Sequence, residues 1–281
     1  MARLIRSRDT GNQPIVGSND DTLSLISFRL LRLAEGESFT LDADLSEHCL
    51  VPMSGVVDIA TAGQSFAAVG GRNGVFDGVA DSVYAPAGHG VTVIAQSAAE
   101  IAVAGARVEG TRDLAAFRIA PDEVEEVDVG SDETHSHRRI RHILGQRQNG
   151  RVDRLLVSEL YAEPGCWSGY PPHKHDTDDG PEETDHEELY HYRFDPPSGF
   201  GTQSCYNDGE TPVVHLTRDG DTFCLDRGYH PTSTSPGHRG YIFTILAGRS
   251  QRGLIQRFEP RHEHLMQAIP GIQDMRKAFN T

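Results

Sequence analysis

The sequence contains few cysteines, a single tryptophan and no long apolar segment. Its four cysteines, Cys49, Cys166, Cys205 and Cys224, are widely spaced and form no Cys-x-x-Cys pair. This spacing argues against a disulfide framework and a cysteine-rich zinc site, and it predicts reduced thiols. No segment approaches the length of a transmembrane helix. A polar stretch follows the N-terminal residues Met1–Arg8, so no secretory signal is predicted.

Positive charge is also scarce. The chain has 26 Lys and Arg residues against 41 Asp and Glu residues, which gives a formal net charge of −15. This acidity argues against nucleic acid or an anionic membrane as a partner, and we expect a cytoplasmic protein. With 281 residues, the chain can form one large domain or two ordinary ones, with a core that needs no disulfide.

Apolar residues rarely recur with the 3.6-residue period of a helix. Short apolar runs are instead separated by turn residues, in a chain with 29 Gly and 15 Pro, and this pattern predicts strands. The predicted strands form two sets, 26–30, 55–59, 91–95 and 100–105, then 153–161, 188–194, 211–216, 222–225 and 240–246. Short strands at this spacing are typical of sandwiches and barrels, so we predict an all-β protein.

The two halves of the chain resemble each other. Aligning Gly88 with Gly228 superimposes the turns 84–90 and 225–230, and Gly90 then falls where His230 stands. Glu47 precedes an apolar stretch much as Glu188 does. We therefore predict two copies of one β unit. These are an N-terminal domain at 1–119, a connector at 120–150 that includes an acid-rich stretch, and a C-terminal domain at 151–281 that alone retains metal ligands.

His173 and His175 are the most informative residues. Side chains two residues apart on a strand share one face, and two imidazoles on one face can hold a divalent metal ion. Glu188 and His230 follow downstream, at the start of an aromatic strand and after a Gly-containing turn. Three imidazoles and one carboxylate leave positions open for water or substrate, as a catalytic metal requires. The alternative is an exposed histidine pair beside a solvated acidic loop.

The neighbouring acidic residues allow two interpretations. Glu188 is preferred to Glu187 as a ligand because Tyr190 then shares its face of the strand, giving a polar and aromatic lining. The carboxylate-rich loop at 176–187 is either a solvated surface loop or a lid over the site. His135 and His137 form a second His-x-His pair, but without the strand and carboxylate that the first pair has. We interpret that pair as a surface feature.

An acidic protein that binds an anion needs local positive charge. Arg138 and Arg141 follow the second histidine pair, and arginine binds carboxylates bidentately, although a solvated strand end is the alternative. Lys174 and Arg193 are weaker candidates, because regular strands would point both side chains away from the neighbouring metal ligands.

The order His-x-His, Glu and Gly-x-His on short strands resembles the cupin superfamily, and two such units resemble a bicupin. The segments 71–78, 82–88, 167–176, 187–200, 226–231 and 246–248 closely resemble the 5-deoxy-glucuronate isomerase family of myo-inositol catabolism. This resemblance covers nearly the whole chain and implies two β-barrel, or jelly-roll, cupin domains. The chain departs from the family in a longer acidic insertion at 176–187, at Ser168, which Gly169 follows where a second serine is usual, and after Phe258.

The resemblance implies an aldose–ketose isomerase that interconverts 5-deoxy-D-glucuronate and 2-deoxy-5-keto-D-gluconate. It implies one divalent metal ion, Zn or Mn rather than Fe or Ni, bound by the four residues named above. A base must move a proton between neighbouring carbons. Glu187, Tyr190, Tyr229 and a metal-bound hydroxide are the candidates for this base.

Three residues are the predicted ligands of the substrate carboxylate: Arg141, Lys174 and Arg193. Two other functions remain open at this point. A cupin dioxygenase would use the same metal site and consume oxygen, whereas a non-catalytic sugar-acid-binding cupin would hold metal and ligand without turnover. Cupin sheets have edge strands that need covering, so we expect a homo-oligomer.

Overall fold

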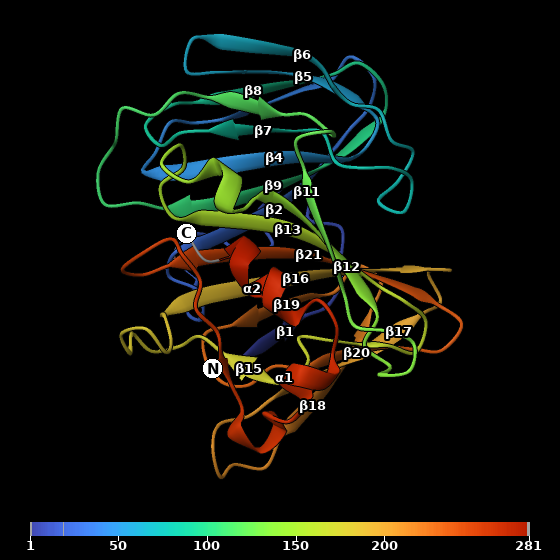
Figure 1. The fold of residues 1–281 in the computed structure, drawn as a ribbon. Coiled ribbons are helices and arrows are strands. Elements are labelled where there is room, and N and C mark those ends of the chain that lie inside the picture. The colour runs from blue at the N-terminus through green and yellow to red at the C-terminus, as the bar shows by residue number, and fades with distance from the viewer. Residues whose placement is uncertain (1, 19, 280–281) are drawn as a thin grey trace.

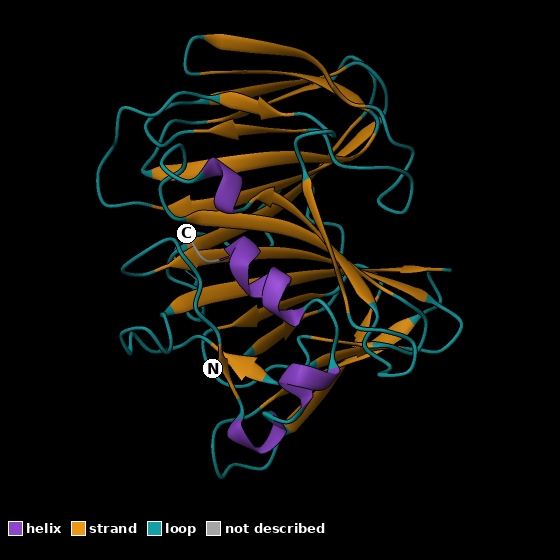
Figure 2. Cartoon of the chain, in the orientation of Figure 1, coloured by secondary structure: helices purple, strands orange, loops and turns teal. Residues whose placement is uncertain are grey.

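The computed structural model describes residues 2–18 and 20–279. The chain folds into two β-barrels stacked one on the other, with the N-terminal half above and the C-terminal half below in Figure 1. Helices are short and few, as Figure 2 shows. The expectation of an all-β protein made of two similar units is confirmed.

Two antiparallel sheets form the N-terminal barrel. In spatial order, the five-stranded sheet contains β10 (Phe117–Ile119), β7 (Ser82–Ala85), β4 (Ser46–Ser54), β9 (Ala99–Arg107) and β2 (Ile26–Leu33). The four-stranded sheet contains β3 (Ser38–Leu41), β8 (Val91–Ala95), β5 (Val56–Thr61) and β6 (Gln64–Gly70). Apolar side chains such as Leu50, Val57 and Ile101 fill the barrel between the two sheets.

The C-terminal barrel repeats this plan with a wider sheet. Its seven strands are β1 (Arg3–Ile5), β19 (Thr222–Leu225), β16 (His186–Asp195), β21 (Arg239–Gly248), β13 (Leu155–Ala162), β12 (Arg138–Leu144) and β11 (Glu125–Val129). The opposing sheet contains β14 (Trp167–Ser168), β20 (Thr232–Thr234), β17 (Phe200–Cys205) and β18 (Val213–Arg218). A short ladder pairs β15 (His173–Lys174) with β22 (Arg257–Phe258).

The described residues also form four short helical segments: η1 (Gln146–Gln148), η2 (Pro260–His262), α1 (Leu265–Ala268) and α2 (Ile272–Phe279). Buried residues Ile272, Met275 and Phe279 of α2 pack on the apolar cluster of the C-terminal barrel. The sequence pattern predicted no helix here. None of the described helices is long and apolar enough to span a membrane.

The two large sheets share one core. Phe28 and Ala104 of the N-terminal barrel belong to the same buried cluster as Val157, Tyr241 and Phe243 of the C-terminal barrel. Successive strand residues alternate between faces, so each central strand has one face toward this shared core and the other toward its own barrel. This arrangement explains why β4 and β21 are buried along almost their entire length.

Strand pairing places the domain boundaries differently from the sequence. β1 lies at the start of the chain but pairs with β19 in the C-terminal barrel. The predicted connector contains β11 and β12, which extend the seven-stranded sheet from β13. Residues 3–5 and 125–144 therefore belong structurally to the C-terminal barrel, because backbone pairing rather than chain order decides membership.

Candidate metal centre

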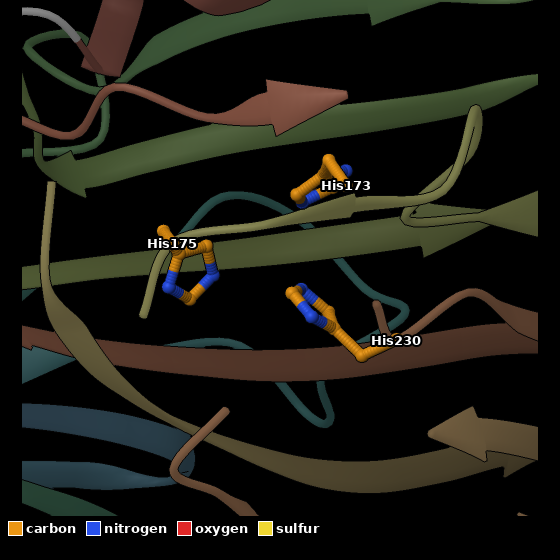
Figure 3. A group of neighbouring side chains, drawn as sticks. All are labelled: His173, His175 and His230. Carbon is orange, nitrogen blue, oxygen red and sulfur yellow. The ribbon is translucent and has the colours of Figure 1, made fainter. Parts of the chain in front are cut away.

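Three imidazoles meet inside the C-terminal barrel. His173 lies on β15, His175 follows it, and His230 lies between β19 and β20. One ring nitrogen of each residue lies within 4.8 Å of those of the other two, and all three side chains are buried. Figure 3 shows the three rings pointing toward one another. The alternative of an exposed histidine pair is therefore wrong.

Hydrogen bonds to the backbone orient the rings. Nδ1 of His173 lies 3.3 Å from the carbonyl oxygen of Pro171, and Nδ1 of His175 lies 3.2 Å from that of His186. Nδ1 of His230 lies 2.8 Å from the carbonyl oxygen of Gly228. A carbonyl accepts only from N–H, so Nδ1 carries the proton in each ring. Nε2 is consequently the nitrogen that can bind a metal, once any proton it shares with Glu188 has left.

The carboxylate of Glu188 completes the group. Its Oε2 lies 3.1 Å from Nε2 of His175 and 3.2 Å from Nε2 of His230. Burial alone would raise the pKa of Glu188, but the two imidazoles more than offset this and hold it well below its usual value. Burial alone would lower the pKa of His175, but its hydrogen bond with Glu188 raises it. Without metal, these residues therefore share a buried ion pair.

These distances suit a metal ion. Donors that each lie about 2.0–2.2 Å from one ion are roughly 3–3.5 Å apart, close to the separations around Glu188. Nε2 of His230 is buried beside Oε2 of Glu188 but makes no well-oriented hydrogen bond, which leaves it available as a ligand. The amide nitrogen of Gln256 lies 3.0 Å from Nε2 of His173 and donates to it. That amide must turn aside when His173 binds metal.

A family model for the KduI/IolB family matches residues 3–265. The chain belongs to the KduI/IolB family. The resemblance recognised in the sequence is thereby confirmed. The match includes all four residues of the candidate centre and ends within α1, before α2 begins.

Curated relatives in this family carry one name. A protein from Geobacillus kaustophilus named 5-deoxy-glucuronate isomerase is 34% identical over 277 residues, covering 95% of this chain and 97% of its own. A protein of the same name from Bacillus subtilis strain 168 is 29% identical over 255 residues, covering 90% and 92%. Like these KduI/IolB relatives, the chain is an isomerase.

Solved structures support the same fold. An IolB-like protein from Salmonella typhimurium LT2 superimposes with a TM-score of 0.86 at 32% identity, covering 93% of this chain and 98% of its own. Oxalate decarboxylase from Bacillus subtilis superimposes with a TM-score of 0.57 at 12% identity, covering 83% and 71%. The second similarity concerns the fold alone, and together the two confirm the predicted bicupin.

Glu187 does not point into the metal centre. It follows His186 on β16, on the opposite face of the strand from Glu188, because neighbouring strand residues alternate. Its carboxylate accepts hydrogen bonds from the backbone N–H groups of Ser24, Leu25 and Ile26 and from the Ser24 hydroxyl. It also accepts one from Arg249. Glu187 joins the two barrels, and the structure does not bring it to the metal centre.

The structure separates the two tyrosines that the sequence proposed as bases. Tyr190 lines a small buried cavity together with His173 and Glu188. Tyr229 follows Gly228 and packs against Tyr206, with ring centroids 5.5 Å apart. Tyr229 is not among the residues that line this cavity. Of the candidate bases in the sequence, Tyr190 therefore remains at the site.

The three predicted carboxylate ligands have other partners. Arg141 lies 2.8 Å from Glu126, stacks over the ring of Tyr161 and donates to the carbonyl oxygen of Gly78 in the N-terminal half of the chain. Arg193 lies 2.6 Å from Glu100 of the N-terminal barrel. The structure does not bring either one to the metal centre, because both side chains point toward the opposite side of the seven-stranded sheet.

Lys174 is also held away from the centre. Its ammonium group lies 2.6 Å from Asp176 and 3.1 Å from Glu183. Asp176 also accepts a hydrogen bond from the backbone N–H of Gly228, 2.7 Å away. The acidic loop is thus anchored at its start to the turn that carries His230, which makes it a support of the site.

Residues lining the cavity include several that the sequence left without a clear role: Arg138, Ser168, Thr244, Gln256, Met275 and Phe279. Arg138 was weighed against Arg141, but nothing in the sequence shows which face of β12 meets the cavity. Ser168 and Gln256 lie on segments without a recognisable pattern. Only the folded chain brings these residues together.

Proposed function

We propose that this chain interconverts 5-deoxy-D-glucuronate and 2-deoxy-5-keto-D-gluconate, the aldose–ketose isomerisation of myo-inositol catabolism. In this proposal, His173, His175, Glu188 and His230 hold one divalent metal ion. The observation that supports it best is the meeting of three buried imidazole groups and one buried carboxylate inside the C-terminal barrel. The names of the curated relatives support the substrate.

A metal ion at this centre would act as a Lewis acid, stabilising negative charge that develops on the sugar oxygens during proton transfer. Imidazole nitrogens suit Zn and carboxylate oxygens suit Mn, and the donor set contains both. The three Nδ1–H hydrogen bonds fix the ring orientations in advance, so binding requires little further ordering of these side chains.

Tyr190 is the residue best placed to donate a proton or hydrogen bond to a substrate oxygen. Burial and the nearby Glu188 carboxylate raise the pKa of Tyr190 well above its usual value. Tyr190 lines the cavity together with His173 and Glu188, and its phenol O–H can donate a hydrogen bond there. We assign Tyr190 the role of hydrogen-bond donor at the reacting oxygens.

Two matched variants test this function. In the purified protein, His230→Ala should lower bound metal below one ion per chain and reduce conversion of 5-deoxy-D-glucuronate at least about 100-fold, because it removes a ligand. His137→Ala is the control, since His137 belongs to the surface His-x-His pair beside Asp128. Elemental analysis of wild-type protein purified without chelator separates Zn or Mn from Fe or Ni. Full activity of metal-free wild-type protein would refute the proposal.

We also infer that the chain forms a homo-oligomer. β18 lies at the end of its four-stranded sheet and carries exposed apolar side chains, with Val213 56% and Val214 58% exposed. An exposed apolar edge strand can pair with the same strand of a second copy in a closed two-fold arrangement.

A further inference from the structure

Arg138 is a buried cation without a carboxylate partner. Arg138 is the first residue of β12 and is 2% exposed. Nη1 donates to the carbonyl oxygen of Ser136 at 2.8 Å, and Nη2 donates to that of Tyr170 at 2.7 Å. Nε is buried with no hydrogen-bond partner. Burial lowers the pKa of Arg138 to about 10, so the group still carries its charge at neutral pH.

Two other buried arginines, Arg72 and Arg252, have different sets of partners. Arg72 forms a two-pronged ion pair with Glu159, at 2.6 and 3.1 Å. Arg252 has no carboxylate in hydrogen-bond contact, but it donates to three backbone carbonyl oxygens and so ties chain segments together. Backbone carbonyls alone can therefore hold a buried arginine. Arg138 differs because it also faces a cavity with further unpaired groups.

The cavity contains a concentration of unsatisfied polar atoms. Arg138, Ser168 and Gln256 line it, and each has a buried polar atom without a hydrogen-bond partner: Nε of Arg138, Oγ of Ser168 and Oε1 of Gln256. A buried polar group left unpaired destabilises the folded protein, because it loses its hydrogen bonds to water. Such a group of atoms is expected where a polar ligand completes the hydrogen bonding.

The dimensions suit the acidic end of a ligand. The cavity has a volume of about 40 Å³, which is enough for roughly three water molecules or one carboxylate group. His173 and Glu188 line the same cavity, so an acid group beside Arg138 lies next to the candidate metal centre, and the cavity must widen to admit the rest of a sugar acid. Met275 and Phe279 of α2 line it as well and limit its size.

We propose that Arg138 and Ser168 form a subsite that binds the carboxylate of a sugar acid whose other end lies at the candidate metal centre. The guanidinium supplies the positive charge and Nε–H, and the Ser168 hydroxyl supplies a second donor. Charge-assisted hydrogen bonds from arginine to a carboxylate are among the strongest in proteins. The identity of the bound acid rests on the proposed function, whereas the preference for an anion rests on this pocket alone.

Two sugars that differ only in charge test the subsite. Binding of D-glucuronate and its neutral amide, D-glucuronamide, is measured by calorimetry on the full-length protein, both as purified and after chelator treatment. The wild-type protein should bind the acid at least about tenfold more tightly than the amide, the factor expected from one charge-assisted hydrogen bond. Arg138→Gln should abolish this ratio, and Ser168→Ala should reduce it several-fold.

Arg141→Gln is the matched control, because it removes an arginine from the same strand, but one that contacts Glu126 and Gly78 on the face away from the cavity. It should keep the wild-type ratio. Ser168→Ala removes a hydroxyl that has no partner, so it should fold normally even if Arg138→Gln does not. An unchanged ratio in Ser168→Ala, or in folded Arg138→Gln, would overturn the subsite, as would a wild-type protein that does not distinguish the two sugars.

The outcomes also separate this proposal from the proposed function. If the chelated protein keeps an acid preference that Arg138→Gln removes, the subsite stands even when no isomerase activity is found. If His230→Ala abolishes isomerisation but Arg138→Gln leaves the ratio unchanged, the proposed function stands and the subsite falls.

Discussion

Residue parity along the strands decides which side chains reach the candidate centre. Glu187 and Glu188 are chemically identical neighbours, yet one caps backbone N–H groups of the other barrel and the other meets two imidazoles. Arg138 and Arg141 are three residues apart on β12 and consequently lie on opposite faces. In both pairs the two residues are an odd number of positions apart. One therefore faces the site and the other faces a neighbouring structural element.

His142 gives the clearest pH prediction for a single residue. It is buried behind α2, with Nδ1 3.0 Å from the hydroxyl of Ser158 and its ring 4.5 Å from that of Phe279. Burial lowers the pKa of His142 from 6.5 to about 4. As the pH falls from 6.5 to 4, the unfolded chain therefore binds a proton that the folded chain does not, and the free energy of unfolding falls.

His142 accounts for a fall on the order of 3 kcal/mol in the free energy of unfolding. This fall takes place below about pH 6.5. Urea unfolding between pH 4 and 7 should therefore show a shallower dependence in His142→Gln than in the wild-type protein. His137→Gln, at the surface beside Asp128, should match the wild-type slope. Equal slopes in all three proteins would show that His142 is not the titrating group.

At the scale of elements, β18 is the strand that most needs a partner. It pairs with β17 on one side, and the side chains of Val213, Val214 and Leu216 are exposed. Natural proteins protect such edges with charge, twist or a covering segment. Because β18 lacks a charged residue between Val213 and Leu216, we expect a second copy to cover it.

Val214→Lys should convert the oligomer to a monomer, since a lysine on the edge disfavours pairing between strands. Light scattering coupled to size-exclusion chromatography measures the change in mass. Ile94→Lys is the control, because Ile94 is also exposed but lies on β8, which has a partner on each side. A wild-type monomer at micromolar concentration, or an oligomer that survives Val214→Lys, would rule out this interface.

At the scale of the whole molecule, each barrel places a buried carboxylate against backbone N–H groups of the other barrel. Glu47 of β4 accepts hydrogen bonds from the backbone N–H groups of Asp153, Arg154 and Leu155, where β13 begins. Glu187 of β16 does the same for the residues that lead into β2. Glu47 is therefore the counterpart of Glu187, one residue away from the predicted match with Glu188. The repeat is reciprocal, and each barrel completes the other.

Glu187→Gln should lower the free energy of unfolding by about 2–4 kcal/mol. The carboxylate has two charged oxygens that accept from the N–H groups, whereas the amide has one uncharged oxygen. Glu47→Gln should behave alike. Urea unfolding measures both, and Glu126→Gln at the surface should change stability by less than about 0.5 kcal/mol. Folded Glu187→Gln should keep its metal and turnover. Wild-type stability combined with lost turnover would restore Glu187 as a base.

Sequence patterns were sufficient for much of this fold. The strands at 91–95 and 222–225 have the predicted bounds, and most of the others differ by a few residues at their ends. The metal-binding motif was also recognisable, because two histidines one residue apart must share a face. Short strands such as β14 and β15 carry no alternation to detect, and β1 pairs with a strand more than 200 residues away.

The sequence by itself determined the β class, the two-fold repeat and the convergence of His173, His175 and His230, because these follow from local alternation and order along the chain. Only the tertiary structure decided which face of each strand meets the cavity and which meets the other barrel. For that reason Arg138, and not Arg141, lines the cavity, and Glu187 caps backbone N–H groups of the other barrel. Burial and hydrogen bonding are properties of packed surfaces, and strand periodicity alone does not say which of two faces will be inside.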